Sequence, residues 1–361
     1  MSEPESAAAA AAWHTEEFPE LRSGPPWVTE EMVAAQPAVV RALLDAPPEG
    51  VGALAGMVRE AHEAGLPVTV VGCGTSEHGA MAIAEQLAAA LGGGWPAPVV
   101  ARQSLDAAEH PQRSGVCIAV SHDGGTRATT LALQSAREAG ARTALVTARP
   151  GGTASGPAEI VLVTPVHDDS WCHTVAYTSA IAVGAALARE LGLATLSGAD
   201  AETLLGEVLA APLDAAALAG SERVLCAGIG IDLITARELA LKLAEGARLQ
   251  TAGLHLETLL HGHLAGEDAG TAVVLIDSDQ GSVRIGRRAE IAEAALAAIG
   301  MPTLRLAVPA STEPLPRLLA GAGALQALTL ELVRARRLNP DLIRREEERY
   351  RRAGEAGDAD W

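Results

Sequence analysis

The most regular feature of the chain is the alternation of short apolar runs with longer runs whose apolar residues have helical spacing. Apolar runs of strand length lie at residues 68–71, 98–101, 116–120, 143–146 and 160–163. Alanine-rich runs of helical length lie among them at 80–91, 126–139 and 174–191. Strands that alternate with helices in this way are typical of a parallel sheet covered on both faces. Residues 50–196 are therefore predicted to form one doubly wound α/β unit.

A second unit with the same plan follows a helical connector at 199–219. Its predicted strands are 224–227, 272–276 and 302–306, and its predicted helices are 233–250, 284–299 and 316–335. The fold class is thus α/β, with two tandem doubly wound parallel-sheet units at 50–196 and 197–338. Further helices are predicted at 27–44 and 51–64. Residues 1–49 form an N-terminal extension, of which 1–25 look disordered and then irregular. Residues 339–361 form a tail, partly on the body and partly in solvent.

Two glycine-containing turns of the first unit stand between a strand and a helix. The first is Gly72-Cys73-Gly74-Thr75-Ser76, and the second is Ser121-His122-Asp123-Gly124-Gly125-Thr126. Glycine lets the backbone approach a ligand closely, and a helix start offers free N–H groups and the positive end of its dipole. Together with the hydroxyl groups, these turns predict a binding site for an anion.

Other interpretations of the first turn are a nucleotide site and a turn without a ligand. A dinucleotide fingerprint would need glycine at position 77, where Glu77 stands, and the chain has no Gly-Lys-Ser/Thr motif of a P-loop. A βα turn that binds nothing is the remaining alternative. The second hydroxyl-bearing turn, in register with the first, argues against it.

Composition narrows the class of partner. The chain has 361 residues, 48% of them hydrophobic and 2% aromatic, which predicts a sizeable core of alanine, leucine and valine. A net charge of −18 argues against nucleic acid or an anionic membrane as partner. The four cysteines are scattered, so we expect reduced thiols and a cytoplasmic location. No signal peptide and no uninterrupted apolar stretch of the ~18 residues that a membrane span needs are visible.

These motifs resemble those of the SIS (sugar isomerase) domain family. The two turns are similar to the sugar-phosphate loops of that family, and the duplicated α/β plan fits it. Within the family, the isomerase half of glucosamine-6-phosphate synthases is similar in residues 30–37, in the helix from Glu238 to Glu245 and in His261-Gly262. The spacing of sixteen residues between Glu245 and His261 also matches. The resemblance covers roughly residues 27–345, and the glutaminase domain of those synthases has no counterpart in this sequence.

The resemblance implies a small-molecule ligand, a sugar phosphate, and no cofactor. The residues that it places around the anion are Gly74, Thr75, Ser76, Ser121, His122, Asp123 and Thr126. The family usually has serine where Asp123 stands. An aspartate there would repel a dianion, because two unit charges ~4 Å apart interact by ~4 kcal/mol at an effective dielectric constant of ~20. We therefore expect Asp123 to cap the helix that begins near Gly124; otherwise the ligand is not an ordinary phosphate.

A further segment of the first unit, 170–174, follows the fifth strand at a helix start. It corresponds to a Ser-Thr-Lys stretch of the family, with His173 in place of serine and Thr174 retained. Contact with the ligand is one interpretation of these residues. The other is that Thr174 is a helix cap and that His173 is a partly buried polar residue.

The resemblance also implies a proton shuttle on an open-chain sugar. Glu245 is the candidate base that moves a proton between C1 and C2. Glu238, Lys242 and Glu245 share one helical face, because their spacing is i, i+4 and i+7. An exposed face held by salt bridges is the alternative. The otherwise apolar sequence from 236 to 247 argues against it, and it predicts apolar surroundings for Glu245.

His261 is the candidate for opening the sugar ring. In the family this histidine reaches the site from the neighbouring subunit, so the resemblance implies a homodimer. A metal cluster of His255, His261 and His263 is an alternative, but the spacing fits no zinc pattern, and no metal is expected. The tail around Asp341 to Arg344 offers no lysine at the position where the synthases have one, which argues against amine transfer. An isomerase or deaminase, a deglycase of ketosamine phosphates, and a sensor without catalysis remain the candidate functions.

Overall fold

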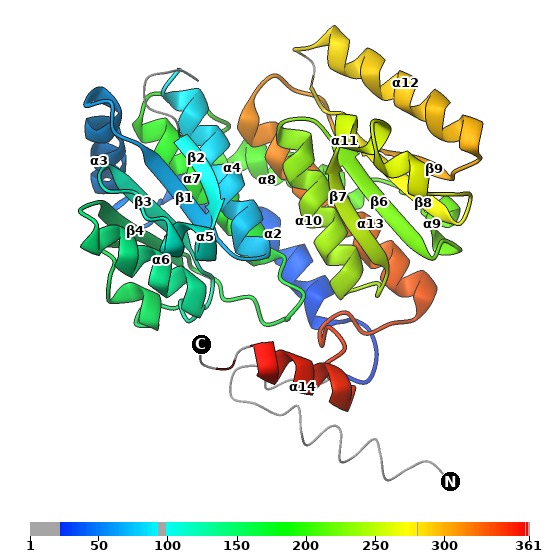
Figure 1. Ribbon diagram of the computed structural model, residues 1–361, viewed down its shortest axis with the longest axis horizontal. Helices are drawn as coiled ribbons and strands as arrows, with labels where there is room; N and C mark the ends of the chain where they lie inside the picture. The colour runs from blue at the N-terminus through cyan, green and yellow to red at the C-terminus, as the bar shows by residue number, and fades with distance from the viewer. Residues whose placement is uncertain (1–21, 93–98, 280, 358, 360–361) are drawn as a thin grey trace.

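The computed structural model describes residues 22–92, 99–279, 281–357 and 359. These residues form two parallel sheets that lie side by side between layers of helices, in agreement with the predicted fold class (Figure 1). Most of the N-terminal stretch expected to be disordered lies outside the described residues. The first residue of the strand expected at 98–101 does so as well.

The first sheet has five parallel strands in the order β2-β1-β3-β4-β5. Its strands are β1 Val68–Gly72, β2 Val99–Gln103, β3 Val116–Val120, β4 Arg142–Thr147 and β5 Ile160–Val163. Its helices are α3 Val51–Glu63, α4 Thr75–Ala90, α5 Ser104–Glu109, α6 Arg127–Glu138 and α7 Val175–Glu190. Strands β1 and β3 are buried along their whole length. Apart from Thr69 in β1, their residues are apolar or glycine, as is typical of parallel strands covered on both faces.

The second sheet has four parallel strands in the order β7-β6-β8-β9. Its strands are β6 Arg223–Gly228, β7 Gln250–His255, β8 Thr271–Ile276 and β9 Thr303–Leu306. Its helices are α9 Ala216–Ala219, α10 Ile231–Glu245, α11 Leu256–Leu260 and α12 Val283–Ile299. The order of β6, β7 and β8 repeats that of β1, β2 and β3, so the glycine turns after β1 and β6 occupy corresponding places.

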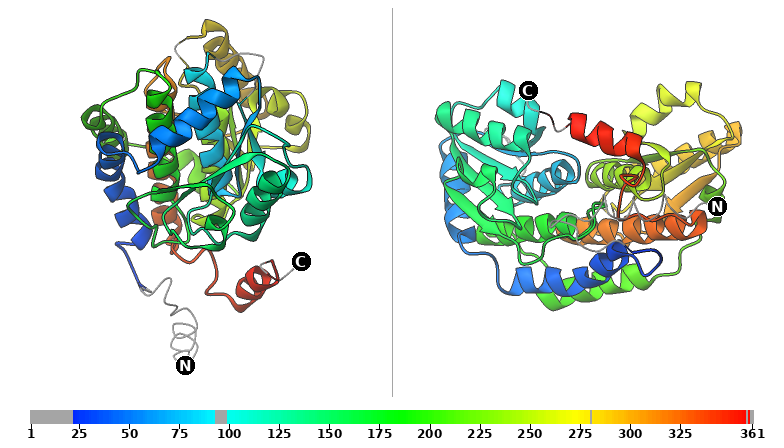
Figure 2. Two further views of the ribbon diagram at one scale, coloured as in Figure 1. Left: turned by 90° about the vertical axis from the view of Figure 1, so that its left-hand side faces the viewer. Right: turned by 90° about the horizontal axis from the view of Figure 1, so that it is seen from below.

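Three long helices join the two units. They are α2 Val28–Asp45, α8 Gly198–Ala210 and α13 Pro314–Arg336, and they lie along the lower side of the molecule in the right-hand view of Figure 2. Helix α2 packs against α7 and α8, whereas α13 packs against α10, α8 and α7. One hydrophobic cluster extends from α2 through both units to α13. The two sheets therefore share a core, which holds the ends of their strands in a fixed relation.

Helix α13 is the one described helix that is long and apolar enough to cross a membrane. Its most apolar stretch is 78% buried inside the fold. Its apolar character is therefore explained by its position in the shared core.

The second unit differs from the predicted pattern at one edge of its sheet. The helix expected at 233–250 ends at Glu245, and residues 250–255 form the edge strand β7. This strand is missing from the prediction because its residues are only partly buried and do not form an apolar run. The connector expected as one helix at 199–219 is also interrupted, between α8 and α9, where Pro212 stands.

Candidate functional site

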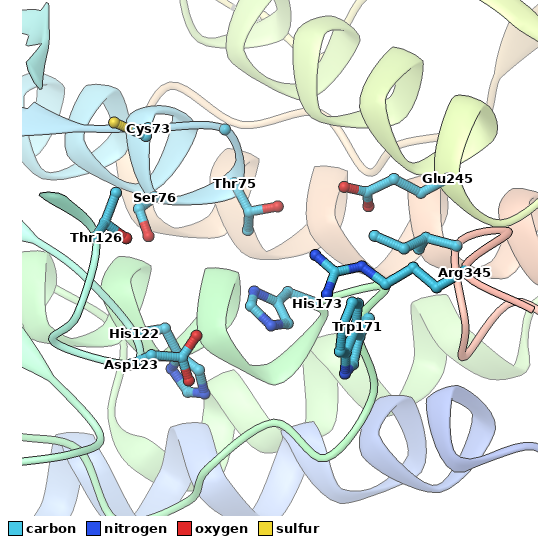
Figure 3. Close-up of a pocket in the computed structure, with 12 residues that line it drawn as sticks. Cys73, Thr75, Ser76, His122, Asp123, Thr126, Trp171, His173, Glu245 and Arg345 are labelled. Carbon is cyan, nitrogen blue, oxygen red and sulfur yellow. The ribbon is translucent and has the colours of Figure 1, made fainter. Parts of the chain in front are cut away.

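A cavity of about 370 Å3 lies where the first sheet, the end of α10 and the C-terminal tail meet (Figure 3). It brings together eight of the residues proposed from the sequence: Gly74, Thr75, Ser76, His122, Asp123, Thr126, His173 and Glu245. Four further lining residues were not among them: Cys73, Trp171, Ile343 and Arg345. Figure 3 shows His122 and Asp123 at one end of the cavity and Trp171 and Arg345 at the other.

The first glycine turn has a backbone that only glycine accommodates at two positions. A Cβ atom at position 72 would lie 2.2 Å from the carbonyl oxygen of Ser76. Gly74 has φ 57° and ψ −129°, a conformation that side chains with a Cβ rarely adopt. This turn starts α4 at Thr75 and so aims the N-terminal end of that helix at the cavity.

The second turn corrects the expected role of Asp123. Helix α6 begins at Arg127 with Thr126 as N-cap, and no side chain caps it. Asp123 instead lines the cavity, with its Oδ1 2.7 Å from Nε2 of His167. The prediction that Asp123 points away as a helix cap is therefore wrong. The capping position falls three residues later than the sequence suggested, because the turn continues through Gly124 and Gly125.

The charges at this end of the cavity are set by burial and by neighbouring imidazoles. Burial by itself would raise the pKa of Asp123, but the hydrogen bond from His167 and the nearby His173 and His122 lower it to about 2. The hydrogen bond to Asp123 in turn raises the pKa of His167. Burial, followed by His173, lowers the pKa of His122 to about 3. At neutral pH, Asp123 is thus an anion and His122 is neutral.

His122 is held in one tautomer by Asp168, which precedes α7. The backbone N–H of Asp168 donates to Nε2 of His122 at 2.7 Å, so the proton of the neutral ring is on Nδ1. The Asp168 carboxylate accepts from the backbone N–H groups of Thr174 at 2.5 Å and Ala176 at 3.3 Å. Asp168 is thus the group that satisfies the start of α7. The Thr174 side chain makes no hydrogen bond with the described residues and does not line the cavity, whereas His173 does.

Ser121 lies below the cavity surface. Its side chain is buried, and its Oγ lies 3.5 Å from Oγ1 of Thr126, which does line the cavity. Ser121 therefore supports Thr126 from beneath.

The predicted shared face of α10 is confirmed, and its carboxylates meet a lysine. Lys242 is 1% exposed, with Nζ 2.5 Å from Oε2 of Glu245 and 3.7 Å from Oε1 of Glu238. Burial would lower the pKa of Lys242, but Glu245 and Glu238 outweigh this effect and raise it. The ammonium group therefore stays protonated. Glu245 carries its carboxylate to the cavity beside this cation, not in the apolar surroundings expected from the sequence.

Glu238 connects α10 to the first glycine turn. Its carboxylate lies 2.6 Å from Nδ1 of His78 and 3.3 Å from Oγ1 of Thr75. Burial would raise the pKa of Glu238, but Lys242 and the His78 hydrogen bond lower it. Glu238 is fully buried and does not line the cavity, so it positions Thr75 and Lys242 and cannot touch a ligand. His78 lies two residues after the first glycine turn, and only the fold brings it to α10.

Residues 66–189, which span the first unit, match the SIS domain family. The chain contains a SIS domain. No curated protein sequence matches the chain significantly.

Solved structures with the same two-unit fold extend the likeness to most of the chain. The C-terminal domain of glucosamine-fructose-6-phosphate aminotransferase from Francisella tularensis has a TM-score of 0.72 and 15% identity, covering 89% of this chain and 99% of its own. Glucosamine-6-phosphate deaminase from Thermotoga maritima has a TM-score of 0.70 and 17% identity, covering 87% and 97%. Tagatose-6-phosphate ketose/aldose isomerase from Escherichia coli has a TM-score of 0.69 and 18% identity, covering 86% and 93%. At these identities the likeness establishes the two-unit α/β fold.

His261 lies outside the cavity of its own chain. It is 73% exposed, pairs with Glu257 at 3.1 Å, and borders a second hollow with Thr258 and His263. His255 caps α11, with its Nδ1 accepting from the backbone N–H of Glu257 at 3.1 Å. The role of His261 at a neighbouring subunit's site therefore stays a prediction.

The described residues bring one set of three potential metal ligands within 4.8 Å of one another, namely His122, Asp123 and His167. One ring nitrogen of each histidine in this set is engaged already. Nε2 of His122 accepts from Asp168, and Nε2 of His167 shares a proton with Asp123. A metal would have to break these bonds, so the SIS site as built does not fit one.

The tail residues that line the cavity are held in place by Asp341. Its buried carboxylate accepts from the backbone N–H groups of Val28 at 3.0 Å and Thr29 at 2.8 Å, at the start of α2. Its carbonyl oxygen accepts from the backbone N–H of Trp171 at 3.1 Å. This anchor places Ile343 and Arg345 at the cavity, with the Arg345 guanidinium over the Trp171 ring. No local sequence signal predicts this, because the contact joins residues far apart in the chain.

Proposed function

We propose that this protein is a phosphosugar isomerase or amino-sugar deaminase that moves a proton on an open-chain sugar. One observation carries the proposal: the Glu245 carboxylate reaches the cavity opposite the hydroxyl-bearing turns, with a buried ammonium directly behind it. The fold supports it, since the structurally similar proteins include a ketose/aldose isomerase and a deaminase.

In this proposal the sugar phosphate binds with its anionic end at Ser76 and Thr126. Its carbons C1 and C2 then lie toward Glu245. Glu245 removes the proton from one carbon and returns it to the other, which is general base catalysis followed by general acid catalysis. Lys242 does not enter the cavity. Its fixed positive charge balances Glu238 permanently and Glu245 whenever that carboxylate is ionised.

His261 completes the site in the proposed homodimer. It is exposed on the surface of the second unit, as a residue that serves a partner's cavity must be. We propose that it opens the sugar ring in the neighbouring subunit's site.

The test is a panel of ligands on the wild type and on Glu245→Gln. The panel contains fructose 6-phosphate, glucosamine 6-phosphate, a fructosamine 6-phosphate and the unphosphorylated sugars. Turnover that is lost in Glu245→Gln while binding is kept supports the proposal. Glu202→Gln, at an exposed ion pair with Arg41 far from the cavity, is the control and retains wild-type turnover.

The panel also distinguishes the other functions. Turnover confined to the fructosamine phosphate would replace the proposal with a deglycase. Tight binding of a sugar phosphate without turnover of any ligand would overturn the enzymatic proposal and leave a sensor.

A further inference from the structure

The anion end of the cavity contains a permanent carboxylate. Asp123 lines the cavity, its Oδ1 is bonded to His167, and no described residue is bonded to its Oδ2. An ionised carboxylate accepts hydrogen bonds and donates none. With a pKa of about 2, Asp123 remains an anion at every pH at which the protein works. A ligand group at this end must therefore bring a proton of its own to meet Oδ2.

The second unit has an aspartate, Asp279, at the position that corresponds to Asp123, and its hydrogen-bond donors can be compared. Asp279 lies three residues before Ser282, the N-cap of α12. In the same way, Asp123 lies three residues before Thr126, the N-cap of α6. The glycine turn before α10 has nearly the same backbone conformation as the first glycine turn: Gly230 has φ 60° and ψ −124°, and Gly74 has φ 57° and ψ −129°. Beside Asp279, a guanidinium group fills the space. Arg317 is 7% exposed and lies 3.2 Å from Asp279 and 3.2 Å from Asp232.

The two aspartates thus have different neighbours in otherwise similar turns. Asp279 faces permanent donors from its own chain, the Arg317 guanidinium and the backbone N–H of Gly281, and its side chain is 21% exposed. Asp123 has only one oxygen bonded to His167, and the space beside it opens into the cavity. A second donor belongs there, and it has to come from the ligand.

We propose that Asp123 makes this site selective for a phosphate monoester that carries one proton. The P–O–H group donates to Oδ2 of Asp123, while the hydroxyl groups of Ser76 and Thr126 donate to the other phosphate oxygens. The site rejects a sulfate ester, which has no proton to donate, and a phosphate dianion, which the carboxylate repels. This inference rests on the proposed function, since it assigns the form of its ligand.

The charges around Asp123 and His167 support selection of the singly protonated phosphate. The groups near Asp123 and His167 are Asp169, His122, His173 and Arg149. His122 stays neutral at working pH because its pKa is about 3. Protonated His167 neutralises Asp123, so a singly charged group adds little repulsion. When His167 loses its proton at higher pH, the same end becomes negative, which weakens anion binding in the same direction as deprotonation of the phosphate.

The experiment measures binding by calorimetry between pH 5.5 and 8. The probes are 1,5-anhydroglucitol 6-phosphate, which has no carbonyl group to isomerise, its 6-sulfate, and the unphosphorylated compound. In the wild type, the affinity for the 6-phosphate falls by about tenfold per pH unit above about pH 6, where a phosphate monoester loses its second proton. The 6-sulfate binds at least about tenfold more weakly than the 6-phosphate at pH 5.5.

Asp123→Asn replaces the acceptor with an amide of the same shape that can donate. In this variant, the affinity for the 6-phosphate loses most of its decline with pH, and the 6-sulfate binds more tightly than in the wild type. Asp169→Asn is the matched control. The Asp169 carboxylate lies 3.4 Å from Nδ1 of His167 and does not line the cavity. We expect this variant to keep the preference for phosphate.

Three results would overturn the inference. They are equal affinity of the wild type for 6-sulfate and 6-phosphate at pH 5.5, an unchanged pH profile in Asp123→Asn, and equal affinity for the unphosphorylated compound. Failure of the proposed function is distinguishable, because it is measured by turnover. A protein that shows the predicted phosphate selectivity but converts no sugar would retain this inference and lose the proposed reaction.

Discussion

At the scale of single residues, a buried ammonium group lies between two carboxylates of α10. Lys242 is the only lysine of the chain, although arginines are frequent throughout it. A compact ammonium group fits between Glu238 and Glu245, whereas a planar guanidinium group needs more space. The sequence places these three residues on one face of a helix. It does not reveal that Lys242 is fully buried, because burial depends on α13 and on the first unit.

Removing this ammonium group is expected to destabilise the protein. Lys242→Met leaves the Glu238 carboxylate buried without its counter-ion, so the free energy of unfolding in urea falls by about 3 kcal/mol. Arg41→Met, which breaks exposed pairs with Glu202 and Asp45, is the control and leaves the free energy of unfolding nearly unchanged. Equal losses in the two variants would show that Lys242 does not balance a buried charge.

The lowered pKa of His122 is expected to make the stability of the protein depend on pH. Its pKa is about 3 in the folded protein, against an ordinary value near 6.5 in the unfolded chain. Between these values the unfolded chain takes up a proton that the folded protein does not, so stability falls as the pH is lowered from 6.5 to 3. The slope due to this one group is at most about 1.4 kcal/mol per pH unit.

The measurement is the free energy of unfolding between pH 4 and 6 for the wild type and His122→Gln. The substitution is expected to reduce the pH slope by about one proton. An unchanged slope would mean that His122 is protonated in the folded protein. That result would contradict its role as acceptor for the backbone N–H of Asp168.

At the scale of elements, most strands and helices of the first unit are predictable, because the buried strands are short, mostly apolar runs that alternate with runs of helical length. Strand β7 and the short helices α5 and α11 are not, since they are edge elements with little apolar character. Gln103 and His255 each cap the short helix that follows an edge strand, which a sequence pattern does not reveal. The tail escapes prediction for a different reason: its position depends on Asp341, whose partners lie at the other end of the chain.

Loss of this anchor is expected to release the tail. Asp341→Asn weakens the hydrogen bonds to the start of α2, so the arginine-rich residues from 344 to 352 leave the body more often. Trypsin is expected to cleave there several-fold faster than in the wild type, and the variant loses affinity for the ligand as Arg345 leaves the cavity. Asp214→Asn, which removes an exposed contact at α9, is the control. Unchanged cleavage would show that other contacts hold the tail.

At the scale of the whole molecule, the arrangement of two parallel sheets is evident from the sequence, whereas the shared core between them is not. The cavity depends on that core, because Glu245 and the glycine turns come from different units. The sequence indicates eight of the residues that line it, and the fold adds Cys73, Trp171, Ile343 and Arg345. His78 and His167 lie behind the lining, bonded to Glu238 and Asp123. The sequence also does not reveal that Asp123 faces the cavity, because its partner His167 lies 44 residues later in the chain.

A homodimer with shared sites predicts complementation between inactive variants. Glu245→Gln and His261→Asn each lose activity. When they are mixed and allowed to exchange subunits, half of the dimers are mixed, and each of these has one intact site. Activity therefore returns to about a quarter of the wild-type value. No recovery in mixtures that demonstrably contain mixed dimers would contradict the role of His261 in the neighbouring subunit.

The proposed reaction requires Glu245 to transfer a proton on the sugar. The most direct measurement follows exchange of the C1 and C2 hydrogens of fructose 6-phosphate and glucosamine 6-phosphate with solvent deuterium by NMR. We expect exchange in the wild type and in Glu202→Gln, and a loss of at least about a hundredfold in Glu245→Gln with binding retained. Exchange at the wild-type rate in Glu245→Gln would contradict the claim.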